Sequence, residues 1–389
     1  MCYSEYDTQL LLTNITIIMA MSKEQVLSGT IIYGDKPEVI EGYLCIEDNI
    51  ITEIGTDTDV DAHFSGVIAP CFVNAHTHIG DSVLKDPPIL DLDSLVKPPM
   101  GLKHRVLRLT PDIDMKHALR QTLLDMINTG TCTFCDYREG GIPGASILIE
   151  VLDSLQDISG IILGRPQRQD EPHIGEPDEL AVICNGIGIS GTNDVSSQVL
   201  EETVDIVRRA GKIFSIHAGE KDASDIPMAI ELRPDFLVHM THAQKNDLSA
   251  ISDADIPVVV CPRSNLITGV GSLTHPPIQK MLDMDIIVGV GTDNVMLNSV
   301  NMFAEMEFLS KVYRLDDGQV FKMCTLYGAT LLGLDQDIGS IMENKQANIM
   351  VLNNRSSNLS NSHNLLASIV RRGRPDDIVK IIRYGREFS

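Results

Sequence analysis

Eight short apolar runs recur along the middle of this chain, and several of them end in polar residues. In chain order they are VIAPCFVNAHTH, GTCTFCDYR, IILGRPQ, NGIGISG, KIFSIHAG, FLVHMTH, IPVVVCPRS and IIVGVGTD. Segments of helical length lie between them, such as residues 115–128 and 196–211. Strands that are buried on both faces have continuous apolar sequences of this kind. Eight strand–helix units within about 270 residues predict an α/β fold, a (β/α)8 or TIM barrel.

The two ends of the chain have a different pattern, which is rich in strands. SGTIIYG, EGYLCIEDN and IITEIG lie within residues 1–67, and GSIMENKQANIMVLN and DIVKIIRYGREF lie within residues 336–389. Short β-branched runs between turn residues are typical of strands. We therefore expect residues 1–67 and 336–389 to meet in one small β-module beside a barrel of residues 68–335. Residues 81–109 are predicted to form a long functional loop.

The chain is strongly acidic, with 31 Lys and Arg residues against 54 Asp and Glu residues and a net charge of −23. Nucleic acid polymers and anionic membranes would be repelled by this charge, so neither is expected as a partner. A small-molecule substrate and assembly into a homo-oligomer remain compatible with it. The apolar residues 10–21 lack a basic flank and are too short to span a bilayer, so we expect an early strand or an extension there.

Eight cysteines are spread over the chain without the spacing of a disulfide framework. This pattern predicts reduced thiols and a cytoplasmic protein. Cys132 and Cys135 form a C-x-x-C pair, which could bind zinc or act in redox chemistry. Because residues three apart on a strand point to opposite faces, we expect two buried thiols instead.

Histidines gather at the ends of three of the predicted strands. His76 and His78 end the first run, His217 ends the fifth, and His239 and His242 end the sixth. His76 and His78 are two residues apart, so both side chains leave the same face of their strand. Barrel enzymes carry their active sites at the carboxyl ends of the strands. These five of the 11 histidines are therefore expected to lie near one another.

Two acidic residues extend this pattern. Glu220 follows His217 by three residues, and Asp293 ends the eighth run. Imidazole nitrogens and carboxylate oxygens are the ligands that zinc and related divalent metals take in catalytic sites. The sequence therefore predicts a metal site at the carboxyl ends of the barrel strands.

These residues together resemble the amidohydrolase superfamily, in which H-x-H, His, His and Asp lie on strands one, five, six and eight. HAGE at residues 217–220 resembles the HxxE segment of its mononuclear deaminases. CPRSN at residues 261–265, which we place on strand seven, resembles the CPxSN segment of the cytosine, guanine and adenosylhomocysteine deaminase and chlorohydrolase branch. GTDN at residues 291–294 resembles the final metal-ligand segment of that branch. The resemblance runs from about residue 27 to the end and implies a barrel with a small β-sandwich built from both termini.

The resemblance also implies roles for individual residues. The metal ligands would be His76, His78, His217 and Asp293. The catalytic residues would be Glu220, which moves protons, together with His239 and Asp293, which flank the attacking water. His242, three residues after His239, would be structural or would support one of the ligands. Binuclear relatives bridge two metals with a lysine of the fourth strand, and the fourth run of this chain contains no lysine. We therefore expect one divalent ion per chain, with zinc preferred and iron or manganese compatible.

Substrate-binding candidates are less specific, because they follow only from their places in loops and at strand ends. They are Lys103, His104, Arg165, Gln167, His173, Arg263 and Asn294.

The expected reaction is the hydrolytic deamination of a nucleobase-like or nucleoside-like amine, with release of ammonia. The alternative keeps the same metal site and changes the leaving group, as in a chlorohydrolase or another hydrolase of amide or cyclic C–N bonds. A non-catalytic scaffold would have lost some of the ligands. Since every ligand position and Glu220 are present, the scaffold hypothesis is disfavoured.

Overall fold

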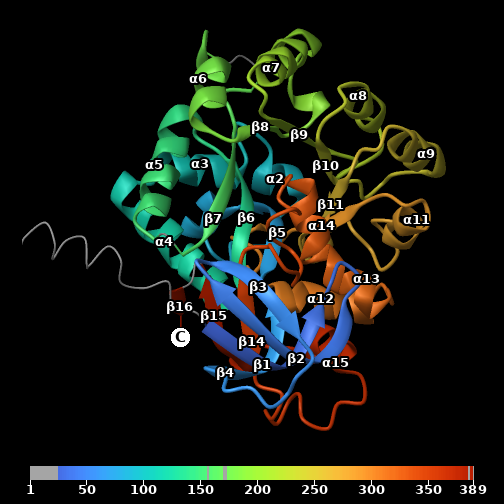
Figure 1. The fold of residues 1–389 in the computed structure, drawn as a ribbon. Helices are drawn as coiled ribbons and strands as arrows, with labels where there is room; N and C mark the ends of the chain where they lie inside the picture. The colour runs from blue at the N-terminus through green and yellow to red at the C-terminus, as the bar shows by residue number, and fades with distance from the viewer. Residues whose placement is uncertain (1–24, 156, 170–172, 384–385, 389) are drawn as a thin grey trace, which may run out of the picture.

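The computed structural model describes residues 25–155, 157–169, 173–383 and 386–388. Its strands form two sheets, and helices surround the larger one (Figure 1). Among these residues, no helix is both long and apolar enough to cross a membrane. The apolar residues 10–21 lie outside the described residues, so the strand or extension expected there stays a prediction.

The larger sheet is a parallel barrel. Its strands are β5 (Phe72–His78), β6 (Thr131–Arg138), β7 (Ser159–Gly164), β8 (Gly186–Ile189), β9 (Ile213–Ala218), β10 (Phe236–His239), β11 (Val258–Val260), β12 (Val288–Val290) and β13 (Asp293–Asn294). Neighbouring strands follow one another in chain order, and β13 pairs with β5 in parallel. Because β13 continues β12 after two residues, this pairing returns the sheet to its first strand. The predicted α/β barrel is confirmed.

Helices alternate with the barrel strands. In chain order the helical segments are η1 (Ile79–Val83), α2 (Leu92–Val96), α3 (Leu102–Leu109), α4 (Asp112–Asn128), α5 (Gly141–Asp153), α6 (Glu176–Ile183), η2 (Thr192–Asp194), α7 (Ser197–Arg209), α8 (Ile226–Glu231), α9 (Lys245–Asp253), α10 (Pro262–Ile267), α11 (Ile278–Asp283), α12 (Met302–Lys311), α13 (Asp317–Met323), α14 (Leu326–Leu331), α15 (Leu365–Arg372) and η3 (Pro375–Asp377). Helix α7 shows why they pack on the sheet: Leu200, Thr203, Val204 and Val207 recur at helical spacing and are buried. The Ser196 hydroxyl accepts a hydrogen bond from the Val199 amide and caps this helix.

The smaller sheet joins the two ends of the chain. Its strands are β1 (Gln25–Tyr33), β2 (Glu38–Glu47), β3 (Ile50–Gly55), β4 (Phe64–Pro70), β14 (Ile349–Leu352), β15 (Ile378–Arg383) and β16 (Arg386–Phe388). Strand β4 pairs with β1 in parallel and with β14 antiparallel, so the hydrogen bonds link all seven strands into one mixed sheet. The expected small β-module from both termini is therefore present, next to the base of the barrel (Figure 1).

One predicted strand is in fact two. The run VIAPCFVNAHTH divides at Cys71, because the Cys71 amide donates to the Asn348 carbonyl while the Phe72 amide donates to the Gly130 carbonyl, both at 2.9 Å. Strand β4 thus belongs to the small sheet and β5 to the barrel. The domain boundary predicted between residues 67 and 68 falls inside β4.

Two further segments differ from the sequence-based expectation. CPRSN is expected on strand seven, but β11 ends at Val260, Cys261 caps the next helix, and Pro262 starts α10. Proline suits the first turn of a helix because the amide it lacks would have no partner there. The predicted loop of residues 81–109 contains the helices α2 and α3. The Asp91 carboxylate accepts a hydrogen bond from the Ser94 amide and so caps α2.

The C-x-x-C pair behaves as its spacing predicts. Cys132 and Cys135 both lie on β6, both are buried, and they belong to different hydrophobic clusters. Cys132 packs with the helices outside the barrel, whereas Cys135 packs with Val238 and Val259 of other barrel strands. Both are free thiols.

Candidate metal centre and active site

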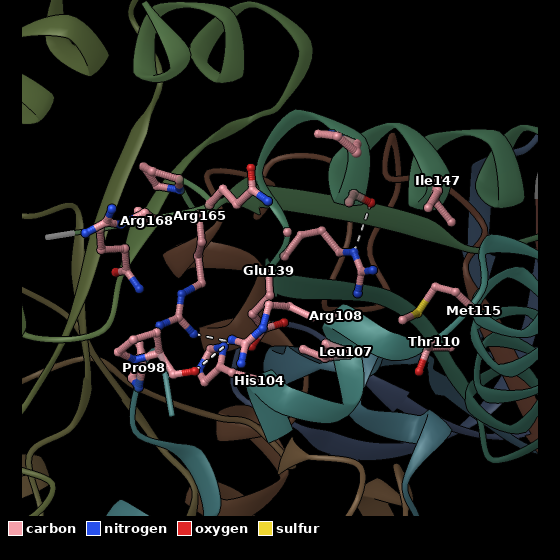
Figure 2. A pocket seen from close by; sticks show the side chains of 18 of the residues that line it. Pro98, His104, Leu107, Arg108, Thr110, Met115, Glu139, Ile147, Arg165 and Arg168 are labelled. Carbon is pink, nitrogen blue, oxygen red and sulfur yellow. Dashed lines mark hydrogen bonds and ion pairs between the residues drawn. The ribbon is translucent and has the colours of Figure 1, made fainter. Parts of the chain in front are cut away.

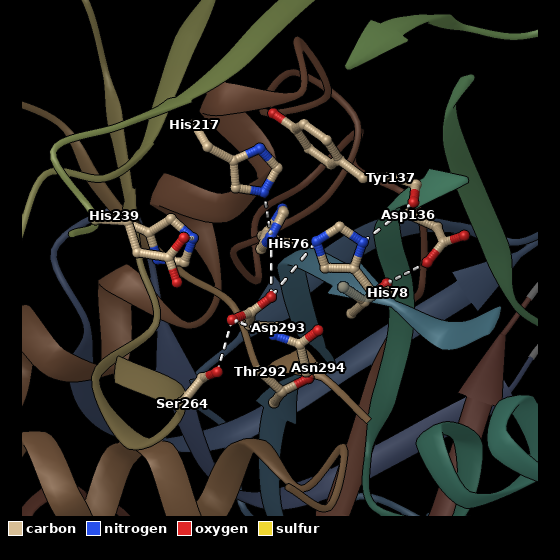
Figure 3. Close-up of polar contacts among 12 residues, drawn as sticks. His76, His78, Asp136, Tyr137, His217, His239, Ser264, Thr292, Asp293 and Asn294 are labelled. Carbon is tan, nitrogen blue, oxygen red and sulfur yellow. Dashed lines mark hydrogen bonds and ion pairs between the residues drawn. The ribbon is translucent and has the colours of Figure 1, made fainter. Parts of the chain in front are cut away.

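Four histidines and one aspartate meet at the carboxyl ends of the barrel strands (Figure 3). His76 Nε2 lies 3.3 Å from His217 Nε2 and 3.4 Å from Asp293 Oδ1. His78 Nε2 lies 3.5 Å from the same Asp293 oxygen. Two sets of side chains are close enough to hold one ion, His76 with His78 and His217, and His76 with His239 and Asp293. The structure thus brings together every residue that the sequence suggested as a metal ligand.

The outer nitrogens of three of these imidazoles are occupied by protein acceptors. His217 Nδ1 donates to the Ile189 carbonyl at 2.8 Å, and His239 Nδ1 donates to Asn265 Oδ1 at 3.0 Å. His78 Nδ1 contacts Glu139 Oε1 at 2.8 Å. Such contacts fix the ring orientation and the tautomer, so that Nε2 is free to bind an ion.

Burial sets the charge of this cluster. It lowers the pKa of His76 to about 3 and places the pKa of His217 well below its ordinary value. It also lowers the pKa of His78. Burial alone would raise the pKa of Asp293, but the hydrogen bond with His76 and the imidazoles around it hold that pKa well below its usual range. At neutral pH His76, His78 and His217 are therefore neutral imidazoles and Asp293 is a carboxylate, which is the protonation state that metal binding requires.

Asp293 is held from several sides. Its Oδ2 accepts hydrogen bonds from the Ser264 hydroxyl at 2.6 Å and from the side-chain Nδ2 of Asn294 at 2.9 Å, which leaves Oδ1 facing the histidines. The backbone of Asp293 has a positive φ of 56°, as does that of His239 at 74°. Left-handed conformations of non-glycine residues are strained, and they gather at functional sites that the surrounding structure holds in place.

A glycine allows the eighth strand to approach the first. A Cβ atom at Gly291 would lie 2.6 Å from the Cβ atom of His76, and as close to its carbonyl oxygen. Any side chain at this position would push Asp293 away from β5.

Glu220 lies beside the cluster, beyond the end of β9. Its Oε2 is 3.6 Å from His239 Nε2, and its side chain is 21% exposed toward a cavity. Burial raises the pKa of Glu220, while His239 opposes the shift. Lys221 pairs with Asp93, so the residue next to Glu220 is not its ion-pair partner.

Glu139 is the main residue of this region that the sequence analysis did not single out. Its Oε1 contacts Lys103 Nζ at 2.7 Å, His78 Nδ1 at 2.8 Å and Arg165 Nη1 at 3.3 Å. Burial alone would raise the pKa of Glu139, but these three bases hold it well below its ordinary value. Glu139 directly follows β6. This position at the carboxyl end of a barrel strand is the feature by which the sequence could have identified Glu139 as a site residue.

Lys103 connects the long first loop to the cluster. It is 2% exposed, and its ammonium also donates to Asn294 Oδ1 at 3.2 Å. Lys103 thus contacts Glu139, which pairs with His78, and Asn294, which follows Asp293 in the chain.

Two adjoining cavities open beside this cluster. The smaller has a volume of about 250 Å³, and Lys103, Arg165, Glu220 and Asn294 are among its lining residues. The larger has a volume of about 490 Å³. His104 and Gln167, which the sequence analysis also gave as substrate-binding candidates, line this larger cavity. Pro98, Arg165 and Asp194 line both.

Two predicted substrate-binding residues lie elsewhere. His173 is exposed, and Arg263 pairs with Glu305 at 3.2 Å. Neither is among the described residues that line the two cavities. His242 stands apart from the metal cluster as well, with its ring stacked on His275.

The sequence of the chain can now be compared with known proteins. The family model described as the amidohydrolase family matches residues 67–387. The chain belongs to the amidohydrolase family. Relatives of this amidohydrolase include an uncharacterised protein of Methanocaldococcus jannaschii, 35% identical over 91% of this chain and 96% of its own length. A provisionally named aminohydrolase of Methanothermobacter thermautotrophicus is 36% identical over 74% of this chain and 79% of its own length.

A more distant relative of this amidohydrolase has a specific name. The 5-methylthioadenosine/S-adenosylhomocysteine deaminase of Caldanaerobacter subterraneus subsp. tengcongensis is 24% identical, and the match covers 97% of this chain and 92% of that protein.

Solved structures share the amidohydrolase fold. An adenosine deaminase from Xanthomonas campestris with bound zinc superposes with a TM-score of 0.80 at 17% identity, over 94% of this chain and 92% of that one. Atrazine chlorohydrolase from Arthrobacter aurescens TC1, complexed with zinc, gives a TM-score of 0.78 at 16% identity, over 93% and 94%. At these identities the similarity establishes the fold.

Proposed function

We propose that this protein is a metal-dependent aminohydrolase that removes an amino group from a nucleobase-like or nucleoside-like ring and releases ammonia. The observation that carries the proposal is the place of Glu220, a carboxyl of raised pKa beside His239 at the edge of the His–Asp cluster. A group that can give a proton to a ring nitrogen therefore lies next to the residues that can hold a metal. The names of the relatives support the same reaction class.

The donor set fits one divalent ion. His76, His78, His217 and Asp293 would hold it, since their free nitrogen and oxygen atoms face one another in the required protonation states. A bound divalent ion lowers the pKa of a coordinated water from about 15.7 to about 7 and so supplies a nucleophile at neutral pH. We propose zinc, which suits three imidazoles and a carboxylate and which two of the structural neighbours contain.

The remaining residues would handle protons and the substrate. His239 and Asp293 would accept the proton of the attacking water, with His239 held in place by Asn265. Glu220 would deliver a proton to the ring nitrogen next to the carbon under attack, take up the proton that left the water from His239, 3.6 Å away, and pass it to the leaving amine. The hydroxyl proton on the attacked carbon would restore the Glu220 carboxyl as the new carbonyl forms. The amino-substituted ring would occupy the cavity of about 250 Å³ that Glu220 and Asn294 line.

The second candidate function is hydrolytic dechlorination on the same site. The fold similarity to atrazine chlorohydrolase supports it, and the metal cluster alone does not choose between the leaving groups. The two functions differ in the ion that they release.

The proposed function predicts ammonia release that depends on one metal ion per chain. Purified protein would be depleted of metal, reloaded in turn with zinc, iron and manganese, and assayed on cytosine, guanine, adenosine derivatives and chloro-triazines. We expect ammonia from at least one amine and one bound ion per chain by metal analysis. Chloride release without ammonia would favour the second function, and two ions per chain would contradict the single-metal site.

The contact between Glu139 and His78 gives a separate prediction. Glu139→Gln should weaken metal binding about 10-fold, at the lower end of the effects of such supporting residues, because it removes the negative charge beside His78 but keeps an acceptor. Metal affinity would be measured by competition with a chelator. Asp194→Asn is the matched control, because Asp194 lines the larger cavity together with Glu139 but is not a residue of the cluster. Equal affinities for the two variants would contradict this role of Glu139.

A further inference from the structure

Helix α3 of the long first loop buries a lysine instead of an apolar side chain. Of the residues of α3, Leu102–Leu109, only Lys103 is buried, and the apolar residues of this helix are partly buried or exposed. Helices usually pack on their neighbours through an apolar stripe. A buried lysine is rare and costly unless its charge is paired. The partners of Lys103 therefore decide how firmly α3 is held on the barrel.

The ammonium of Lys103 is held by groups of the barrel ends. It lies 2.7 Å from Glu139 Oε1, directly after β6, and it donates to Asn294 Oδ1 of β13 at 3.2 Å. Asp81 Oδ2 lies 3.9 Å from the same nitrogen. Lys103 and these three residues are all buried. Removal of one partner from a buried ion pair is strongly destabilising, because the other charge is left uncompensated.

A second ion pair between the loop and the barrel is much more exposed. Lys221 Nζ contacts Asp93 Oδ2 of α2 at 2.7 Å, but the two side chains are 59% and 41% exposed. Exposed ion pairs contribute little to stability, because water and salt screen them. Of these two ion pairs, the buried one of Lys103 therefore contributes more to the attachment of the loop.

Helix α3 in turn holds α2, the other helix of the loop. His104 follows Lys103, and its Nε2 donates to the Val96 carbonyl at 3.0 Å. Figure 2 shows His104 and Pro98 of the loop near Glu139 of the barrel, and all three line the larger cavity. A change in the attachment of α3 should therefore move α2 as well.

Helix α2 and the residues after it form part of the smaller cavity. Leu92, Val96 and Pro98 line this cavity together with Glu220 and Asn294. The loop thus supplies apolar side chains to the cavity, whereas the barrel supplies the polar groups proposed for the reaction.

We propose that Lys103 is a positioning residue, which holds the first loop, residues 81–109, on the barrel beside the smaller cavity. This inference rests on the proposed function, because that cavity is where the amino-substituted ring would bind. Lys103 fixes α3 on Glu139 and Asn294, and α3 fixes α2. The apolar side chains of α2 then pack against the face of the ring. Lys103 thus acts on substrate binding through the loop.

The test replaces Lys103 by methionine, which is unbranched and uncharged. In the zinc-loaded protein, the backbone amides of residues 92–109 should exchange hydrogen roughly 10- to 100-fold faster, because a charge-assisted contact is lost. Amides of α7, residues 197–209, should exchange as in the wild-type protein, which distinguishes a loosened loop from general unfolding. Mass spectrometry of the exchanging protein measures both segments.

Three further variants make the test specific. Arg105→Met is the matched control, because Arg105 is an exposed cation of α3 that is not among the residues lining the two cavities, and it should exchange as the wild-type protein does. Lys103→Arg keeps the charge that pairs with Glu139 and should exchange more slowly than Lys103→Met. Glu139→Gln removes the partner's charge and should also loosen the loop, so it serves if Lys103→Met does not fold.

The kinetics of Lys103→Met should show which step the loop affects. We expect KM for the deaminated amine to rise by about 10-fold and kcat to change less, because packing of the loop on the ring is the same in the ground state and the transition state. Arg105→Met should leave KM unchanged. A fall in kcat at constant KM would contradict a role in substrate binding.

Hydrogen exchange needs no turnover, so it separates this inference from the proposed function. Unchanged exchange of residues 92–109 in Lys103→Met would overturn the positioning role. Loss of zinc from the variant while the loop stays protected would overturn it as well. Faster exchange confined to the loop, in a protein that releases ammonia from none of the amines, would support the positioning role and overturn the proposed function.

Discussion

Replacing His217 by alanine should remove the bound metal and lower turnover by about 10⁴-fold or more, because the nucleophile depends on the bound ion. His217 lies at the centre of the cluster, with its Nε2 3.3 Å from His76 Nε2 and its ring stacked on that of His78. Without it, two imidazoles and one carboxylate remain of the proposed ligands. Metal content after gel filtration and the rate of ammonia release are the two measurements.

The fold should survive this change. His217 is at the end of β9, and the apolar core is formed by other side chains of the barrel. Circular dichroism would verify folding of the variant. His242→Ala is the matched control, because His242 follows a neighbouring strand and stacks on His275 outside the cluster. A His217→Ala protein that keeps one ion per chain would refute the ligand assignment.

Much of the barrel could be predicted because its strands are buried on both faces. β8 and β11 are buried along their whole length, and their sequences, GIGI and VVV, contain no polar side chain. The break at Cys71 could not be predicted in the same way. The residues on both sides of Cys71 are equally apolar, and only their hydrogen-bond partners, Asn348 and Gly130, assign them to different sheets.

The metal cluster was predictable for a related reason. Parallel strands bring their carboxyl ends together, so polar residues that end β5, β9 and β13 had to approach one another. Residues that act from loops follow no such rule. Lys103 reaches Glu139 and Asn294 only because the path of residues 81–109 returns to the barrel, and no periodicity in the sequence encodes that path.

Arg138 illustrates a second limit. Its place at the end of β6 follows from the sequence, but the hydrogen bond from its Nε to the Gly144 carbonyl does not. An arginine in a chain with 54 acidic residues would be expected to find a carboxylate. Arg263 pairs with Glu305 at 3.2 Å, whereas Arg138 acts on Asp136 of its own strand, where its charge opposes the rise in the Asp136 pKa that burial causes.

Glu220→Gln should keep the metal and lower turnover by at least about 10²-fold, the lower end of the effect of general acid–base groups. Glutamine has the size and hydrogen-bonding reach of glutamate but cannot carry the proton. The proposed ligands His76, His78, His217 and Asp293 are unchanged. Substrate binding should change less than kcat, because the loss falls mainly on the transition state.

The same role of Glu220 predicts the direction in which activity changes with pH. Burial raises the pKa of Glu220, so its protonated form persists to higher pH than that of an ordinary glutamate. If that form is the acid, the activity of the wild-type protein should fall as the pH rises through this pKa, and Glu220→Gln should lack that limb. Glu231→Gln, an exposed change at the end of the following helix α8, is the control.

The competing explanation makes Glu220 a surface carboxylate paired with a nearby base. The contacts already weaken it, since Lys221 pairs with Asp93 and Arg263 with Glu305. On that explanation Glu220→Gln would turn over as the wild-type protein does. A variant with full metal content and near-normal turnover would thus remove the proton-transfer role, and with it the observation that favours deamination over dechlorination.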